Sequence, residues 1–227
     1  MKIKAVILCK KKSQRLKNKN TRRFLNYKFG LLELKIKQLI KVKKINQIII
    51  STDDHRIIGK FKNYNKKVIT LKRSKDLCNF KTKTEDLIKY ISEISTDSKI
   101  LWTQVSSPLV NEKIYKKAID IYLKKIQHGY DSLMSVTAKK QFLWDKKRPI
   151  NYKISKYKKW PRTQDLRKIY IINSAIFIFD QKIYKKYKDR VGKKPIFFEI
   201  NEKFSIDIDN YDDFKIAEIL YNSRVKL

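Results

Sequence analysis

Short apolar runs alternate along the chain with segments whose apolar residues recur every three or four positions. The runs have the length of buried strands, whereas the spaced pattern, seen for example at residues 32–40, is typical of amphipathic helices. The strands expected in the first part of the chain are Ile3–Leu8, Gln47–Ser51, Val68–Leu71, Lys99–Gln104 and Ser132–Val136. Further helices are expected at residues 84–94 and after the capping residue Asn111. This alternation predicts an α/β fold with a mostly parallel sheet.

The segment Thr137–Arg167 interrupts this rhythm. It holds two of the three tryptophans, two of the four prolines and many charges. We interpret it as an insertion, such as a hairpin arm that covers a site or a partner subunit. Beyond it, the expected elements are strands at Ile169–Phe179, Ile196–Ile200 and Phe204–Ile208 and a closing helix at Tyr211–Tyr221. Since no repeat and no Pro/Gly-rich linker divides the chain, we expect residues 1–227 to form a single domain.

The composition is strongly basic. With 56 Lys and Arg against 22 Asp and Glu, the formal net charge is +34. Such a charge suggests nucleic acid or another polyanion as a partner. The excess is spread along the whole chain, however, and an AT-rich genome would also give a solvated surface rich in Lys, Ile, Asn and Tyr. We therefore favour compositional drift over a nucleic-acid role, and expect the charge to attract small anions.

The cysteine content and the apolar runs indicate a cellular compartment. Two cysteines, Cys9 and Cys78, imply neither a disulfide framework nor a zinc site. No apolar run reaches the roughly 20 residues that span a bilayer. The stretch Ala5–Cys9 is too short for the core of a signal peptide. We expect a cytoplasmic protein that does not contact a membrane.

Polar clusters follow three of the expected strands, at Lys10–Asn20, Asp53–Asp54 and Gln104–Ser107. In open α/β sheets ligands bind beyond the carboxyl ends of the strands, so these clusters are expected on one surface.

The first of these clusters can bind phosphate. Ser13 and backbone N–H groups can donate to phosphate oxygens. Lys10, Arg15 and Lys19 can neutralise them. It is not a Walker loop, because the pattern GxxxxGK followed by Ser or Thr is absent. From the residues alone, the cluster is either a triphosphate loop or a solvated basic turn.

Two acids near the end of the chain form a candidate metal site. Asp207 and Asp209 lie two apart at the end of an expected strand, so their carboxylates are predicted to share a face. Hard oxygen ligands in this arrangement suit Mg²⁺ bound jointly with phosphates. The alternative is that they are surface acids or helix caps, the role we expect for Asp212 and Asp213.

Residues Trp160–Phe179 offer polar groups for a hydroxylated acid. Arg162 can bind a carboxylate through both guanidinium nitrogens. Gln164 and Asn173 can make amide contacts with hydroxyl groups. The alternative is an ordinary loop followed by a buried strand.

Taken together, these segments resemble the CMP-sialic acid synthetase (acylneuraminate cytidylyltransferase) family, with the CMP-Kdo synthetases as more distant relatives. Residues 5–20 resemble the family's nucleotide loop, AxIPARGGSKRLPGKN, and the matching residues are Ser13, Arg15, Leu16, Lys19 and Asn20. Residues 104–109 are similar to QPTSPL, whose Gln faces the sugar. Residues 162–176 are similar to RxQDLPxxYxxNGAI, and residues 205–209 match the SIDID metal motif. The resemblance covers nearly the full length, in the family's order.

The resemblance implies a fold and a reaction. The fold is a three-layer, Rossmann-like α/β nucleotidyltransferase domain, and the arm at residues 137–167 reaches toward the partner's site in a homodimer. CTP and an acidic 2-keto sugar would give CMP-sugar and pyrophosphate. The implied metal ligands are Asp207 and Asp209, which hold Mg²⁺ and, with Lys19, count as the catalytic residues. The implied nucleotide ligands are Lys10, Ser13, Arg15, Lys19 and Asn20, and the implied sugar ligands are Gln104, Ser106, Arg162, Gln164 and Asn173.

The chain also departs from the family pattern at several positions. Lys10 replaces the loop arginine, Lys11 and Lys12 replace a pair of Gly or small polar residues, and Gln14 replaces a lysine. Val110 replaces the arginine after QPTSPL, and Phe80 replaces a frequent aspartate. Two other hypotheses therefore stay open: a weakened homologue that acts as a binding or scaffold protein, and a nucleic-acid-binding protein that reuses the fold. The sequence does not identify the sugar.

Overall fold

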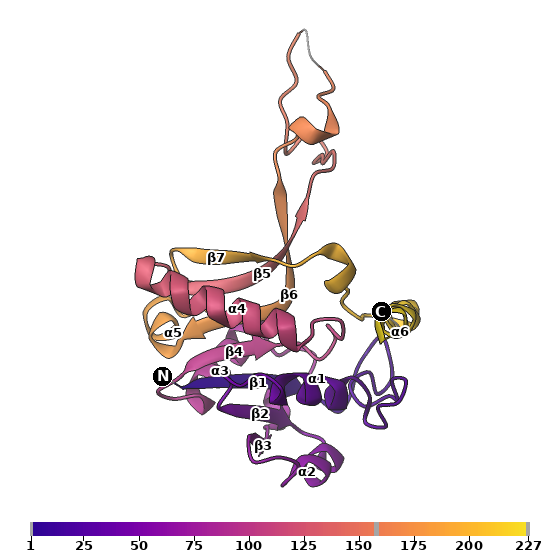
Figure 1. The fold of residues 1–227 in the computed structure, drawn as a ribbon, viewed down its shortest axis with the longest axis vertical. Coiled ribbons are helices and arrows are strands. Elements are labelled where there is room, and N and C mark those ends of the chain that lie inside the picture. Colours follow the sequence, from indigo (N-terminus) through magenta and orange to yellow (C-terminus); the bar gives the residue numbers. More distant parts are fainter. Residues whose placement is uncertain (1, 157–158, 226–227) are drawn as a thin grey trace.

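The computed structural model describes residues 2–156 and 159–225. Seven strands form one sheet in the order β3-β2-β1-β4-β6-β5-β7 (Figure 1). Their bounds are β1 Ile3–Cys9, β2 Gln47–Thr52, β3 Val68–Lys72, β4 Lys99–Thr103, β5 Ser132–Lys139, β6 Ile169–Asp180 and β7 Pro195–Glu199. Only β6 runs antiparallel to its neighbours, β4 and β5, within the described sheet. The α/β fold and the mostly parallel sheet predicted from the sequence are confirmed.

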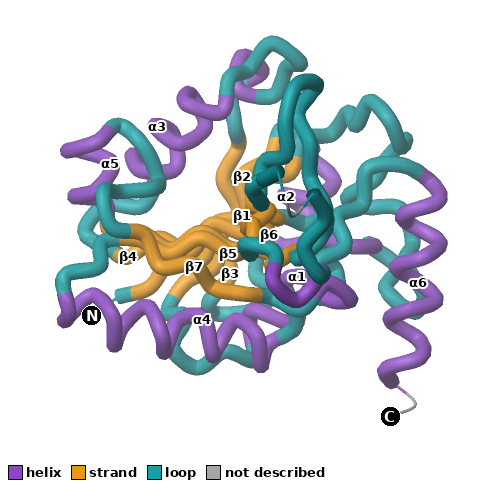
Figure 2. Tube along the Cα trace, turned by 90° about the horizontal axis from the view of Figure 1, so that it is seen from above, coloured by secondary structure: helices purple, strands orange, loops and turns teal. Residues whose placement is uncertain are grey.

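Helices cover both faces of the sheet, because successive strand residues point to opposite sides. On one face, α1 (Gly30–Ile40) and α4 (Glu112–Lys125) bury apolar side chains against a cluster that includes Ile7 and Leu101. On the other face, Val6 and Trp102 join a second cluster with α3 (Thr84–Ile94) and α5 (Gln181–Tyr187). Figure 2 shows α3 and α5 on the side of the sheet opposite to α4. The core therefore has two layers, one on each side of β1 and β4.

The two remaining α-helices of the described residues pack into the same cluster as α1 and α4, one through Ile57 and Phe61 and the other through Phe214 and Ala217. Helix α2 (His55–Phe61) follows β2, and α6 (Tyr211–Val225) closes the chain. The cap predicted at Asn111 is confirmed, since its side chain accepts a hydrogen bond from the Ile114 N–H at 3.1 Å. Helices α2 and α5 were not predicted, because seven residues are too few for a periodic pattern to stand out. None of the helices in the described ranges is long and apolar enough to cross a membrane.

The strand predicted at Phe204–Ile208 is wrong. The segment begins with a short 3-10 turn at Glu202–Phe204 and then runs without strand pairing. Ile208 is fully buried, and Phe204 and Ile206 pack partly against the core. The alternation of apolar and acidic residues therefore reflects one buried side of an irregular segment, not a place in the sheet. The premise that Asp207 and Asp209 share a strand face fails with it.

The predicted hairpin arm is present and projects from the ends of β5 and β6 (Figure 1). Because β5 continues to Lys139, the arm begins three residues later than expected. Away from the sheet it has an aromatic cluster of its own. The Phe142 ring centroid lies 5.3 Å from that of Tyr152 and 5.4 Å from that of Trp160.

Candidate nucleotide-binding site

A cavity of about 300 Å³ lies beyond the carboxyl ends of β1, β3 and β4. Three of the polar segments singled out from the sequence meet there: the loop after β1, the turn after β4 and the acidic segment before α6. Residues predicted for the site that line this cavity are Lys10, Ser13, Arg15, Lys19, Asn20, Gln104, Ser106 and Asp209. The predicted meeting of the segments after β1 and β4 on one surface is therefore observed, whereas their part in binding a ligand stays a prediction.

The loop after β1, residues 10–21, is held closed by its own residues. The Asn20 side-chain amide donates to the Lys10 carbonyl at 3.1 Å, which joins its two ends. The Lys11 N–H donates to Asp53 at 2.7 Å, which ties the loop to the end of β2. Where α1 begins, Gly30 has φ +61° and any Cβ there would collide with the Arg22 carbonyl, so only glycine fits. Contacts within the chain therefore fix the conformation of this loop.

Two cations of this loop contact the acidic segment. Arg15 Nη2 donates to Asp209 Oδ1 at 2.6 Å, and Lys19 Nζ lies 3.8 Å from the same oxygen. Lys19 also donates to the Ile208 carbonyl at 2.7 Å. Asp213, in the first turn of α6, accepts from the Asp209 N–H at 2.9 Å and so orients the segment. The contacts bring opposite ends of the chain to one point.

Asp207 lies on the other side of this segment. It lines a neighbouring hollow of about 270 Å³ together with Asn173 and Ser205. Partial desolvation raises the pKa of Asp207, although the Ser106 hydroxyl and the charge of Lys19 act in the opposite direction. The carboxylates of Asp207 and Asp209 therefore flank the backbone at Ile208 and open into adjacent hollows.

Arg73 was missed by sequence reasoning, although it follows β3 directly and the strand-end rule applies to it. It is 4% exposed and donates from Nε to the Cys78 sulfur at 2.9 Å. Its Nη1 has no hydrogen-bond partner among the described residues. This places an incompletely satisfied buried cation in the wall of the cavity.

Two of the departures from the family pattern contact each other. Lys10 Nζ lies 4.6 Å from the centroid of the Phe80 ring, and both residues line the cavity. Phe80 is 56% exposed, so its ring is open to solvent at the mouth. A lysine and an aromatic ring at this distance attract each other.

The predicted sugar ligands in and near the arm do not line this cavity. Arg162 pairs with Asp165, with Nε 2.9 Å from Oδ2, and the backbone carbonyl of Gln164 accepts from Lys140 Nζ at 2.7 Å. Asn173, in β6, is engaged within the sheet by Ser135 at 2.6 Å and Thr137 at 3.1 Å. Both residues belong to the arm, which projects away from the sheet within one chain (Figure 1). Their part in binding stays a prediction.

A family model described as cytidylyltransferase matches residues 5–225. This chain belongs to the cytidylyltransferase family. Its relatives include an N-acylneuraminate cytidylyltransferase of Streptococcus agalactiae, 27% identical over 147 residues, which cover 63% of this chain and 35% of that protein. An N-acylneuraminate cytidylyltransferase of Escherichia coli is 25% identical, with 95% of this chain and 51% of the relative covered. N-acylneuraminate cytidylyltransferase A of Danio rerio is 24% identical, with 95% and 50% covered. The chain thus spans about a third to a half of the length of these relatives.

Solved structures show the same fold. A CMP-2-keto-3-deoxy-manno-octonic acid synthetase in complex with CTP superposes with a TM-score of 0.68 at 11% identity, covering 99% of this chain and 100% of that one. The 4-diphosphocytidyl-2C-methyl-D-erythritol synthase of Anaerococcus prevotii superposes with a TM-score of 0.65 at 18% identity, covering 97% and 98%. The nucleotidyltransferase fold and the family inferred from the motifs are therefore confirmed.

Proposed function

We propose that this cytidylyltransferase-family chain transfers CMP from CTP to an acidic 2-keto sugar and releases pyrophosphate. The anomeric hydroxyl oxygen of the sugar forms a bond to the α-phosphorus, and the bond from that phosphorus to the β-phosphate oxygen breaks. Pyrophosphate leaves with the electron pair, and the hydroxyl proton passes to solvent. The observation that carries the proposal is the contact of Arg15 with Asp209 at 2.6 Å, which joins the phosphate-binding loop to the acidic segment. Phosphoryl-type transfer depends mainly on positioning and charge neutralisation.

The nucleotide would lie in the 300 Å³ cavity. Lys10, Arg15 and Lys19 would neutralise the triphosphate, and Ser13 would donate a hydrogen bond to it. Asn20 acts indirectly by keeping the loop closed through its bond to the Lys10 carbonyl. The unpartnered Nη1 of Arg73 gives the wall one further donor, which a bound nucleotide would satisfy.

Asp207 and Asp209 would hold a magnesium ion bound jointly with the phosphates, each from its own side of the segment, since the charge of Asp209 acts on Asp207 and the two carboxylates therefore lie within electrostatic range of each other. Carboxylate and phosphate oxygens are hard ligands, and Mg²⁺ commonly takes one or two carboxylates and completes its shell with phosphate and water. The Asp209 side chain is 40% exposed and Asp207 is also accessible, so both can receive the ion. When bound, the ion would neutralise phosphate charge and polarise the α-phosphorus. The Arg15 guanidinium would then leave Asp209 and form an ion pair with the triphosphate instead.

The sugar would bind next to the turn after β4. Gln104 lines the cavity there, and Ser106 adjoins Asp207. Arg162 and Gln164 lie on the projecting arm, from which they would reach the cavity of a second copy in a homodimer. Asn173 would act from the hollow that it shares with Asp207. The relatives named for N-acylneuraminate favour a sialic acid-like sugar, since all three curated relatives above carry that name.

The experiment is a pyrophosphate-release assay with CTP, Mg²⁺ and a panel of sialic, legionaminic, pseudaminic and Kdo-type sugars. We expect release with one class of these sugars, and none when CTP is replaced by ATP or GTP. Tight CTP binding without release for any sugar would favour the weakened homologue. Retention on DNA or RNA at physiological salt, without CTP binding, would favour the nucleic-acid protein.

A further inference from the structure

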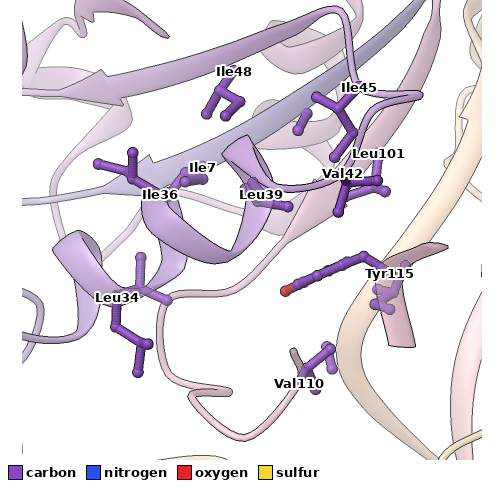
Figure 3. Close-up of a cluster of buried hydrophobic side chains, with 14 of the residues drawn as sticks. Ile7, Leu34, Ile36, Leu39, Val42, Ile45, Ile48, Leu101, Val110 and Tyr115 are labelled. Atoms are coloured by element: carbon purple, nitrogen blue, oxygen red, sulfur yellow. The ribbon is translucent and has the colours of Figure 1, made fainter. Parts of the chain in front are cut away.

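Lys35 is a buried lysine that forms no ion pair among the described residues. It lies in α1 with 0% of its surface exposed. Its Nζ contacts three oxygen acceptors: the Ser107 carbonyl at 2.7 Å, the Val110 carbonyl at 3.4 Å and the Tyr115 hydroxyl at 2.7 Å. Figure 3 shows Tyr115 extending its hydroxyl from α4 toward α1. Buried lysines are uncommon without a carboxylate, so these three acceptors must hold the group in place.

The hydrogen-bond directions around Nζ match an ammonium group. Thr103 donates its single hydroxyl hydrogen to the Ala175 carbonyl at 2.8 Å. In the 2.6 Å bond between Thr103 and Tyr115, the phenol is therefore the donor. The Tyr115 oxygen is then left to accept from Lys35. Nζ thus donates to all three acceptors, which uses the three hydrogens of an ammonium.

Two of these acceptors belong to the turn at residues 104–110, which follows β4. Gln38, one helical turn beyond Lys35, donates to the Pro108 carbonyl of the same turn at 2.8 Å. Side chains of α1 therefore hold three backbone carbonyls of this turn from one side. No charged side chain other than Lys35 takes part in this contact within the described residues.

The other side of the turn meets the acidic segment. The Ile208 N–H donates to the Ser106 carbonyl at 2.9 Å, one residue from a carbonyl that Lys35 holds. Ile208 lies between Asp207 and Asp209, and its own carbonyl accepts from Lys19. The turn is thus a direct link from Lys35 to the segment that carries both acids.

We propose that Lys35 is a positioning residue, which fixes the turn at residues 104–110 and through it the placement of Asp207 and Asp209 against the phosphate loop. An ammonium suits this task because its three donors bind acceptors that diverge from one point. The role of the acids rests on the proposed function, whereas the link from Lys35 to their segment is a property of the chain alone.

This link is sensitive to pH. Burial lowers the pKa of Lys35 to about 7. The groups that face Nζ from the packed elements are the phenol of Tyr115 in α4 and uncharged carbonyls of the turn. Burial raises the pKa of Tyr115, which keeps the phenol neutral. Since burial opposes the charged form, a lysine exposed by opening of the turn binds its proton more tightly than the buried one, so the turn is expected to become better protected as pH rises past neutral.

Hydrogen exchange of the full chain, followed by mass spectrometry, tests the proposal without requiring activity. In Lys35→Met we expect amides at residues 104–111 and 203–210 to exchange about 10-fold faster, while β1 and β4 keep their protection. Lys37→Met is the matched control, because it removes the same charge from the exposed face of the same helix. Unchanged exchange in both segments, or uniform acceleration through the core, would overturn the proposal.

Two further measurements keep the test decisive. After correction for intrinsic rates, the wild type should gain protection in these two segments between pH 6 and pH 8, and Lys35→Met should not. If Lys35→Met does not fold, Tyr115→Phe removes one acceptor and should give a smaller acceleration in the same segments.

Local acceleration in a protein that shows no CTP turnover would contradict the proposed function and leave the positioning role standing. Turnover in the wild type with no local change in the variants would contradict only the positioning role.

Discussion

The guanidinium of Arg15 lies 2.6 Å from the carboxylate of Asp209, although 194 positions separate the two residues in the sequence. The contact joins the loop after the first strand to the segment before the last helix. Both side chains are partly exposed, at 66% and 40%, so the pair by itself stabilises the fold little. Its importance under the proposed function is chemical, because it places the cation proposed to bind phosphate next to an acid proposed to bind magnesium.

The two acids should be essential for turnover. Asp207→Asn and Asp209→Asn remove a charge that Mg²⁺ requires, so each should lower kcat at least about 100-fold while thermal unfolding stays near that of the wild type. Asp212→Asn is the matched control, since it is exposed and removes the same charge three residues from Asp209 and five from Asp207. Turnover within a few-fold of the wild type in both variants would refute the metal assignment.

Arg162 should affect the sugar and not the nucleotide. Arg162→Ala is expected to raise the sugar KM about 10-fold or more, with the KM for CTP unchanged, because a bidentate carboxylate contact is lost. Arg162→Lys should recover only part of the affinity. Arg148→Ala, an exposed arginine on the same arm, serves as the control. A selective loss of CTP binding would instead assign Arg162 to the nucleotide.

Mixing variants tests whether the arm acts across a dimer. Arg162→Ala has an intact acidic segment, and Asp209→Asn has an intact arm. If each site combines the arm of one subunit with the acids of the other, a mixture of the two variants, assayed at a sugar concentration well below KM where both are impaired, should recover up to about a quarter of wild-type activity. No recovery after verified subunit exchange would mean that the arm does not serve the partner's site.

Lysines in the nucleotide loop should make CTP binding salt-dependent. Contacts of exposed ammonium groups are screened over about 8 Å at 0.15 M salt. Changing Lys10, Lys11 and Lys12 together to alanine should make the affinity for CTP depend less on salt concentration. Titration calorimetry with Mg-CTP at several salt concentrations measures this dependence. Since Lys10 alone of the three lines the cavity, Lys10→Ala should account for most of the change. If the CTP affinity of the wild type and of the triple variant falls equally with rising salt concentration, these lysines do not bind the phosphates.

Lys35 should make stability depend on pH. Its pKa of about 7 in the folded chain lies below the ordinary lysine value of 10.5. Between these values the unfolded chain binds more protons, so this group makes the free energy of unfolding rise with pH, by up to about 1.4 kcal/mol per unit. Below pH 7 the full cost of burying the ammonium is present. Urea unfolding from pH 6.5 to 9 should show a steeper rise for the wild type than for Lys35→Met. Parallel curves would mean that Lys35 keeps an ordinary pKa.

Much of the fold could be predicted, because apolar runs such as Ile3–Cys9 record burial on both faces of a sheet. The helix at Thr84–Ile94 agrees with the prediction at both ends, since Leu87, Ile88 and Ile91 mark its inner face. The segment Phe204–Ile208 was mistaken for a strand, because period-2 alternation reports a buried side but not hydrogen-bonded pairing.

The site was predictable only in part. The strand-end rule gathers residues such as Lys10 and Gln104 at one edge, and the motif match adds Asp209. The same rule applies to Arg73 after β3, whereas the burial of Lys35 and the contact of Phe80 with Lys10 depend on tertiary neighbours that no local pattern records. Lys35 is an example, because its burial follows from carbonyls 72 and 75 positions further along the chain.

The most direct test of the proposed function follows the α-phosphorus itself by ³¹P NMR, with CTP, Mg²⁺ and a sialic acid-like sugar. Conversion of the α-phosphate signal into a CMP-sugar phosphodiester, with one pyrophosphate formed per diester and no reaction in Asp209→Asn, is the predicted result. An unchanged CTP spectrum with every acidic 2-keto sugar tried, or an equal conversion by Asp209→Asn, would contradict the account.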